Sequence, residues 1–160
     1  MISRRRFVGV ATIATVLAGS AAAEQHDPVI LTVTGLEEVR EYSLAELRAI
    51  GIESFETTTI WSDGAQKFTG VPLVALLEDL GIQDGTLSAK AINDYVIDIP
   101  VSDGVEDGPI LAFEINGKPM SVREKGPLWL VYPYDHNPDY RSEVIYSRSV
   151  WQLEAIEILP

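Results

Sequence analysis

The chain has 160 residues, of which 46% are hydrophobic and 22% charged, with 12 glycines and 9 prolines. This composition is too apolar for intrinsic disorder and too mixed for a fibrous protein, and the length predicts one domain. Twelve Lys and Arg against 24 Asp and Glu give a formal net charge of -12, which disfavours nucleic acid and anionic lipid as partners. There is no cysteine in the sequence, so the chain itself provides no disulfide, thiolate metal ligand or cysteine nucleophile.

The N-terminus has the pattern of an export signal. Three arginines at positions 4–6 precede an apolar run over residues 7–18, and small residues continue to Ala23. Because this run is shorter than the ~20 residues of a spanning helix, we expect a cleaved signal peptide over residues 1–23, with an uncleaved anchor as the alternative. The arginines fit a twin-arginine-like or a general secretory signal. Cleavage would remove three basic and no acidic residues, which leaves residues 24–160 as a periplasmic domain with a net charge of -15.

The first half of the domain predicts a strand, a capped helix, a β-hairpin and a second helix. Alternating hydrophobic residues indicate the strand, and a capping box of Ser43 and Glu46 indicates where the first helix begins. Residues rich in Thr, Ile and aromatic side chains indicate the hairpin, and Pro72 suits the first turn of the second helix. The predicted ranges are 29–33 for the strand, 44–50 for the first helix, 55–61 and 67–68 for the hairpin around Asp63-Gly64, and 72–80 for the second helix.

The second half of the domain predicts further strands. Asn116-Gly117 has the composition of a hairpin turn. The predicted ranges are 91–99, 110–115, 118–120, 128–132 and 150–158. Because strands predominate over two short helices, the predicted fold class is α+β, mostly β with a few short helices.

Two segments carry candidate binding residues. Asn93-Asp94-Tyr95 lies inside the predicted apolar strand 91–99, where an Asp is costly unless it is paired or faces a site; a satisfied structural Asp is the alternative. The stretch from Lys125 to Asp135 is crowded with aromatic side chains, and Asp139-Tyr140-Arg141 follows it. Aromatic planes beside a carboxylate and an arginine suit a flat, hydrogen-bonding heterocycle, although an aromatic core with an ordered loop explains the same pattern.

The sequence shows no metal-binding or catalytic-triad motif. Its histidines, His26 and His136, are far apart and have no partner residues at the spacing of a zinc site or a Ser-His-Asp triad. A group of acids around Pro100 lacks the ligand spacing of a calcium loop, so we interpret it as a solvated edge, with calcium as the weaker alternative. These acids are Asp98, Asp103, Glu106 and Asp107.

Four motifs occur in an order that is typical of one known family. They are Phe68-Thr69-Gly70-Val71-Pro72-Leu73, Asn93-Asp94-Tyr95 with Ile99-Pro100, Leu111-Ala112 with Asn116-Gly117-Lys118-Pro119-Met120, and Lys125-Gly126-Pro127-Leu128-Trp129-Leu130-Val131-Tyr132-Pro133. In this pattern the chain resembles the oxidoreductase molybdopterin-binding domain family, which has the sulfite oxidase fold. The resemblance covers the chain from about residue 29 to 160 and implies this fold for the domain.

The resemblance also draws attention to a missing residue. Catalytic members of the family hold molybdenum through a cysteine in the segment before the Gly-Val-Pro-Leu helix, which here reads Glu56-Thr57-Thr58-Thr59-Ile60-Trp61. A threonine hydroxyl is neutral and hard, whereas a thiolate is charged and soft, so this departure argues against molybdenum catalysis. The acidic net charge also disfavours a phosphorylated molybdopterin.

Cysteine-free, exported, single-domain members of the family resemble periplasmic pterin-binding proteins that report to a membrane-bound enzyme of cyclic-di-GMP metabolism. The resemblance therefore implies a pterin ligand, no catalytic activity and a signalling enzyme as partner. Two alternatives stay open: a molybdopterin-dependent oxidoreductase without the usual cysteine ligand, and a ligand-free protein interaction module.

A pterin is planar and offers an amino group beside a ring N–H, a pair of donors that a carboxylate accepts at two points. Asp94 or Asp135 would accept this pair, and Thr59 lies near the position of the missing cysteine. The candidates for stacking on the ring are Trp61, Tyr95, Trp129, Tyr132 and Tyr134, and the candidate donors to a ring carbonyl or side-chain hydroxyl are Arg141 and Arg148. The alternatives are core packing for the aromatic residues and surface ion pairs for the arginines. We predict no metal ligand.

Overall fold

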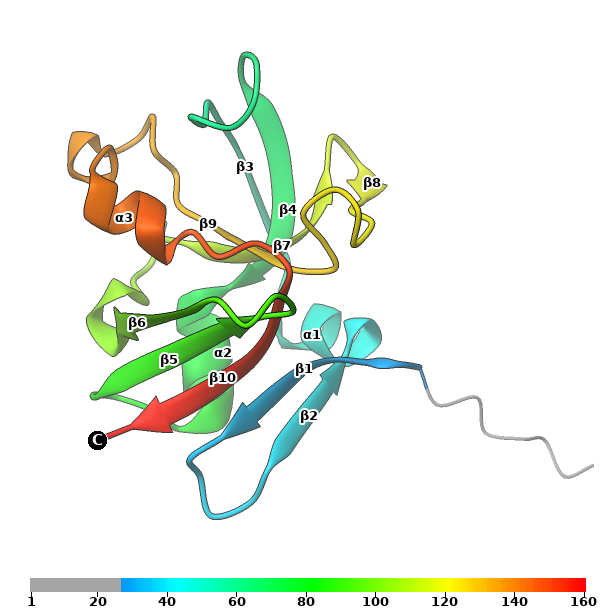
Figure 1. The fold of residues 1–160 in the computed structure, drawn as a ribbon, viewed down its shortest axis with the longest axis vertical. Helices are drawn as coiled ribbons and strands as arrows, with labels where there is room; N and C mark the ends of the chain where they lie inside the picture. Colours follow the sequence, from blue (N-terminus) through cyan, green and yellow to red (C-terminus); the bar gives the residue numbers. More distant parts are fainter. Residues whose placement is uncertain (1–26) are drawn as a thin grey trace, which may run out of the picture.

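A computed structural model describes residues 27–160, which form two five-stranded sheets and three short α-helices (Figure 1). The predicted signal peptide over residues 1–23, the start of the domain at residue 24 and His26 lie outside the described residues. Strands predominate, so the α+β class is confirmed. Within residues 27–160, no helix has the length and apolar character needed to cross a lipid bilayer.

The first sheet, here sheet A, has the strand order β2-β1-β10-β5-β6. Its strands are β1 (Val29–Thr34), β2 (Arg40–Ser43), β5 (Thr86–Ala91), β6 (Val96–Pro100) and β10 (Leu153–Leu159). The C-terminal strand β10 runs parallel to β1 and antiparallel to β5 in the middle of the sheet. The end of the chain therefore joins the N-terminal hairpin β1–β2 to the β5–β6 hairpin.

The second sheet, sheet B, is built around β7 and is antiparallel throughout. Its strands are β3 (Glu53–Thr57), β4 (Gln66–Pro72), β7 (Ile110–Ile115), β8 (Lys118–Pro119) and β9 (Trp129–Val131). Gly70 lies at a register shift in the pairing of β4 with β7, and a Cβ atom at this position would be 2.1 Å from the Leu111 carbonyl oxygen. This close approach explains the glycine of the Gly-Val-Pro-Leu motif.

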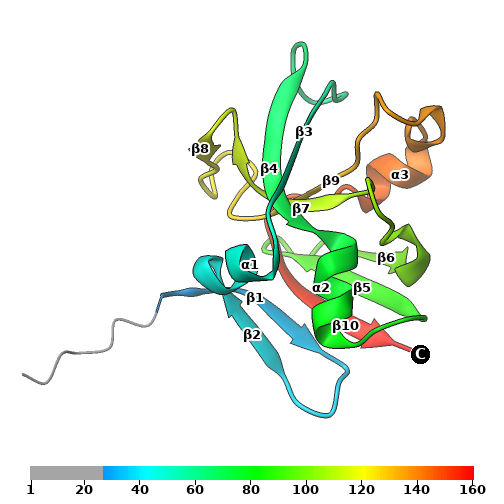
Figure 2. The same cartoon turned by 180° about the vertical axis from the view of Figure 1, so that it is seen from behind.

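The helices cover the sheets on different sides. Helix α1 (Leu44–Ile50) begins with the predicted capping box, and α2 (Leu73–Leu80) ends at Gly81 in the left-handed conformation. Figure 2 shows α1 and α2 together, with α2 in front of β5 and β10. Helix α3 (Glu143–Arg148) lies on another side, next to β6, and 3-10 turns occur at Val101–Asp103 and Pro138–Tyr140.

Most predicted elements are present, but β2 and all of β5 except Ala91 were not predicted, and other predictions need correction. The strand predicted over 91–99 is instead the end of β5, a turn at residues 92–95 and β6, because Asp94 takes a positive φ of 64° that extended strands do not allow. The strand predicted over 55–61 ends at Thr57, and residues 58–61 form a loop. Helix α3 was not predicted, and Pro72 is the last residue of β4 rather than the first of α2.

Candidate functional site

Trp61 lies at the centre of an aromatic cluster. Among the described residues, its indole meets the rings of Trp129, Tyr134, Tyr146 and Trp151 edge to face, with centroids 5.5–6.4 Å apart. The loop after β3 provides Trp61, β9 and the loop after it provide two partners, and α3 and the segment after it provide the other two. Edge-to-face packing in several directions fixes the plane of the central indole.

Buried hydrogen bonds hold this cluster in place. The Trp129 Nε1 donates to the Ser149 carbonyl at 3.2 Å, and the Tyr134 hydroxyl pairs with the Ser149 hydroxyl at 2.6 Å. Burial raises the pKa of Tyr134 to about 12, so its phenol stays protonated at physiological pH. Ser149 thus joins the C-terminal end of α3 to the fully buried side of the cluster.

A cavity of about 280 Å³ opens beside Trp61, and we refer to it as the Trp61 cavity. Its lining residues are Trp61, Ala91, Asn93, Tyr95, Tyr146, Ser147, Ser149, Val150 and Trp151. The Tyr95 hydroxyl donates to the Ser147 carbonyl at 2.9 Å, which ties the β5–β6 turn to α3 across the cavity. The Trp61 and Trp151 Nε1 groups and the Asn93 Nδ2 group donate to no acceptor within residues 27–160, so they are available to a ligand.

A second cavity of about 260 Å³, the Thr58 cavity, shares Tyr146 with the first. Its lining residues are Thr58, Thr59, Ile60, Tyr134, Arg141 and Tyr146. The Asp135 carboxylate clamps the wall of this cavity, because it accepts from the Thr58 N–H and hydroxyl at 2.7 Å and from the Arg141 Nη2 at 2.8 Å. The hydrogen bond from the Thr58 N–H, with those from its hydroxyl and from Arg141, holds the pKa of Asp135 below its usual value.

The structure brings six of the predicted residues to these cavities. Trp61 and Tyr95 line the Trp61 cavity, and Thr59, Tyr134 and Arg141 line the Thr58 cavity. Asp135 accepts hydrogen bonds from Thr58 and Arg141, two residues in the wall of the Thr58 cavity. Trp129 is completely buried and supports the cluster from behind.

Three predicted residues lie elsewhere. Asp94 lies in the exposed β5–β6 turn rather than inside a strand, and its carboxylate is 3.0 Å from the Lys90 Nζ. Tyr132 is fully buried, and its hydroxyl donates to Asp103 at 2.8 Å; burial is the main reason that the pKa of Tyr132 is raised. Arg148 pairs with the same Asp103 at 3.0 Å. Asp103 is therefore half-buried and paired, which corrects its interpretation as part of a solvated edge.

Two cavity residues, Tyr146 and Trp151, were not among the predicted site residues. Tyr146 belongs to α3, a six-residue helix whose apolar positions are too few to give a clear period. Trp151 lies between α3 and β10, in a range that the sequence predicted as part of a strand over 150–158. The sequence signal that could have predicted the start of α3 is Ser142 before Glu143, because Ser142 caps the helix by accepting from the Ile145 N–H.

The two sheets and the aromatic cavity between their hairpins define an α+β domain of the sulfite oxidase type. Residues 19–136 match the family described as the oxidoreductase molybdopterin binding domain, and the chain belongs to this family. The structure is similar to the sulfane dehydrogenase SoxCD from Paracoccus pantotrophus, with a TM-score of 0.61 and 19% sequence identity. The match covers 81% of this chain and 37% of that chain, so the domain corresponds to about a third of the SoxCD chain. No curated protein matches the sequence.

The residues present do not fit a molybdenum-bearing cofactor. In the segment where catalytic relatives carry cysteine, the Thr57 hydroxyl donates to the Thr58 carbonyl, the Thr58 hydroxyl donates to Asp135, and the Thr59 hydroxyl pairs with Ser62 at 2.7 Å. None of these hydroxyls replaces a thiolate, and the described residues contain no group of three or more His, Asp or Glu side chains placed to hold a metal ion. Arg141 is the single cation that lines either cavity in residues 27–160, and Asp135 already neutralises it.

Proposed function

We propose that this domain binds the ring of a pterin in the Trp61 cavity and does so without molybdenum chemistry. The observation that carries the proposal is the set of aromatic side chains from three segments around a cavity of about 280 Å³. Small-molecule pockets usually measure ~300–1,000 Å³. The Trp61 cavity therefore suits one planar ring system with a short substituent better than a phosphorylated cofactor with a long extension.

The polar groups around the cavity complement a pterin. The Asn93 Nδ2 and the Trp61 and Trp151 Nε1 groups are donors, which suit the ring carbonyl and the unprotonated ring nitrogens. We assign the carboxylate for the amino group and ring N–H to Asp94, which does not line the cavity but shares a turn with Asn93 and Tyr95, which do. Its side chain is 82% exposed and its ion pair with Lys90 is weak, so the carboxylate can turn toward a ligand. Asp135 is instead held in place by three donors.

The proposed cellular role rests on the resemblance to periplasmic pterin-binding proteins. We place the domain in the periplasm after removal of residues 1–23, where it reports pterin occupancy to the periplasmic part of a membrane-bound enzyme of cyclic-di-GMP metabolism. Such reporting requires that the partner binds the pterin-bound and pterin-free forms with different affinity. Crosslinking in cells that produce or lack pterins tests this role, and equal capture of the enzyme in both contradicts it.

The binding proposal is tested by releasing small molecules from purified protein and titrating the emptied protein with a dihydropterin. We expect a fluorescent pterin to be released and to rebind at one site. Tyr95→Ala should weaken binding about tenfold, because loss of one stacked ring costs about 1.4 kcal/mol. Tyr140→Ala is the matched control, since Tyr140 lines neither cavity and packs on Tyr132.

The two alternatives predict different results. Molybdenum at nearly one equivalent per chain would favour the oxidoreductase alternative and overturn the proposal. Protein that is empty as purified and binds no pterin would favour the interaction module. Equal loss of affinity in the Tyr95 and Tyr140 variants would show that the ligand lies outside the Trp61 cavity.

A further inference from the structure

The basic residues divide into those that form ion pairs with carboxylates and those that do not. Residues 27–160 contain nine Lys and Arg side chains and 23 Asp and Glu side chains. Five of the nine cations form salt bridges to carboxylates: Arg40, Arg48, Lys90, Arg141 and Arg148. The other four, Lys67, Lys118, Arg123 and Lys125, have no carboxylate partner within the described residues. Because carboxylates outnumber cations in this domain, the position of the four cations without a carboxylate partner is informative.

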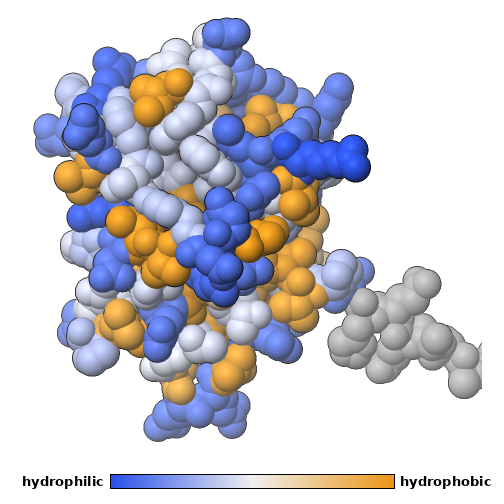
Figure 3. All heavy atoms as spheres, viewed as in Figure 1, coloured by the Kyte–Doolittle hydropathy of each residue, from blue (hydrophilic) through white to orange (hydrophobic). Residues whose placement is uncertain are grey.

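Three of these four free cations lie in one short segment beside a large cavity. Lys118, in β8, and Lys125 line a cavity of about 640 Å³, the β8 cavity, and Arg123 belongs to the exposed loop between them. Strongly hydrophilic side chains project at the edge of the molecule where β8 lies, with hydrophobic side chains close by (Figure 3). Lys67 differs, because it alternates with the lining residues Gln66 and Phe68 along β4 and so faces away from the cavity.

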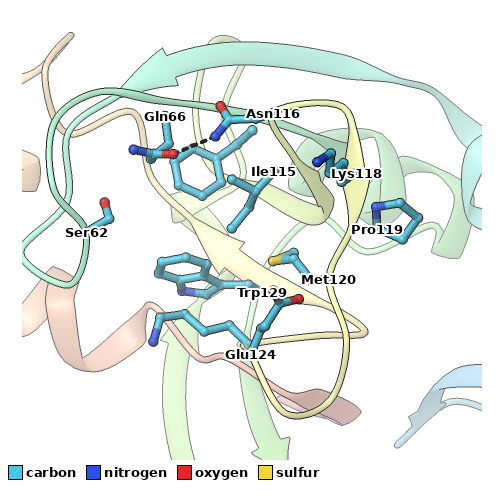
Figure 4. A pocket seen from close by; sticks show the side chains of 11 residues that line it. Ser62, Gln66, Ile115, Asn116, Lys118, Pro119, Met120, Glu124 and Trp129 are labelled. Carbon is cyan, nitrogen blue, oxygen red and sulfur yellow. Dashed lines mark hydrogen bonds between the residues drawn. The ribbon is translucent and has the colours of Figure 1, made fainter.

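The walls of the β8 cavity are apolar on two sides. Ile115 comes from β7, and Met120 and Trp129 lie across from it (Figure 4). Phe68 comes from β4 and packs edge to face on Trp129, with ring centroids 5.4 Å apart. At one end of the cavity, the Asn116 Nδ2 donates to the Gln66 side-chain oxygen at 2.6 Å, which fixes both amides. The cavity is therefore a pre-formed apolar space with polar groups at its rim, as in ligand sites generally.

The charges at the rim favour an anion. The Lys125 Nζ lies 4.5 Å from the centre of the Trp151 ring and 5.4 Å from that of Trp129, so aromatic faces rather than a carboxylate hold its ammonium group. The one carboxylate in the lining, Glu124, accepts from the Ser121 N–H and hydroxyl at 2.9 and 3.2 Å. Glu124 thus stabilises the loop turn, and its Oε1 is the one acidic group that a bound anion would have to avoid.

We propose that the β8 cavity binds an amphipathic organic anion, a compact apolar or aromatic body that carries one carboxylate, sulfonate or phosphate group. The body lies against the apolar wall formed by Phe68, Ile115, Met120 and Trp129, and Lys118 and Lys125 bind the anionic group. This site is separate from the Trp61 cavity, because the two share no lining residue. The proposal does not depend on pterin binding.

The probe for this site is 1-anilinonaphthalene-8-sulfonate, an aromatic anion whose fluorescence rises in apolar surroundings. Its neutral counterpart is N-phenyl-1-naphthylamine, which lacks the sulfonate. We expect the wild-type domain to bind one anionic probe in preference to the neutral one. The double variant Lys118→Gln/Lys125→Gln should bind the anion about fivefold more weakly, as expected when two solvent-exposed charge contacts are lost, and the neutral probe unchanged. Added salt should reduce this difference.

Lys67→Gln is the matched control, because it removes a free cation of the same type from outside the cavity. A loss in this variant as large as in the double variant would show a general effect of net charge and overturn the proposal. Equal binding of the two probes, or unchanged anion binding in the double variant, would also overturn it. Displacement of the anionic probe by a dihydropterin would place the probe in the Trp61 cavity instead. Circular dichroism of each variant identifies any that fail to fold, and for those Lys118→Arg, which retains the charge, should bind like the wild type.

Discussion

Arg148 anchors α3 to the rest of the domain, and its replacement by methionine is the most direct test of how the Trp61 cavity is held together. The Arg148 Nη1 is 3.0 Å from Asp103, which also accepts from the Tyr132 hydroxyl, and the side chains of the pair are only 23% and 16% exposed. Exposed pairs contribute at most about 1 kcal/mol, and breaking a buried pair costs about 3–5 kcal/mol. For this partly buried pair we expect Arg148→Met to destabilise the domain by about 2 kcal/mol.

Urea unfolding followed by tryptophan fluorescence measures this loss as a lower midpoint at unchanged slope. Arg40→Met is the matched control, because Arg40 is 3.4 Å from Asp79 with side chains 47% and 36% exposed, and it should lower stability by less than about 0.5 kcal/mol. In a double-mutant cycle with Asp103→Asn, the pair should show a coupling of at least about 1 kcal/mol. Equal losses for the two arginine variants, or a coupling near zero, would refute the assigned role of Arg148.

Two further predictions concern the Asp135 carboxylate and the close approach of β4 to β7 at Gly70. Because the folded state lowers the pKa of Asp135, its contribution to stability is complete above the unfolded pKa near ~4 and is lost as the pH falls through the folded value. Melting temperatures of Asp135→Asn should therefore fall less steeply below pH 4 than those of the wild type, and parallel curves would contradict this. Gly70→Ala should destabilise the domain by more than about 2 kcal/mol in urea unfolding, because its Cβ would meet backbone at 2.1 Å. Gly51→Ala, where the nearest atom is 3.9 Å away, should change stability by less than about 0.5 kcal/mol.

Local signals in the sequence were sufficient for much of the fold. The capping box at Ser43 predicted the start of α1, and Asn116-Gly117, with positive φ at both residues, predicted the β7–β8 turn. These signals act within a few residues of each other, so tertiary contacts do not override them. The α+β class and the family followed from several such local motifs in the right order.

The β5–β6 hairpin shows where local reasoning failed. The apolar run that begins at Ala91 looks continuous, but the chain turns at Asn93-Asp94 because the Asn93 side chain accepts from the Tyr95 N–H and Asp94 adopts a left-handed conformation. Sequence reasoning therefore placed Asp94 in the wrong environment, although it did select Tyr95, which lines the cavity. Cavity residues such as Tyr146 depend on the packing of α3 against β6, and no local pattern encodes that contact.

The Thr57–Ser62 loop shows how the cavity keeps its shape through the chain's own residues. The Thr57 hydroxyl accepts from the Asp135 N–H at 3.1 Å, Asp135 accepts from Thr58, and the Thr59 hydroxyl accepts from the Trp61 N–H at 3.1 Å. Thr57 and Thr58 thus tie this loop to Asp135, and Thr59 positions the backbone of Trp61 within it. Because the Thr59 hydroxyl accepts from the Trp61 N–H, replacing Thr59 by a residue without a side-chain acceptor would remove a bond that positions the backbone of Trp61. At this position the chain uses a side-chain oxygen to place the aromatic wall of the cavity, a role that a cysteine sulfur, a weak acceptor, would fill less well.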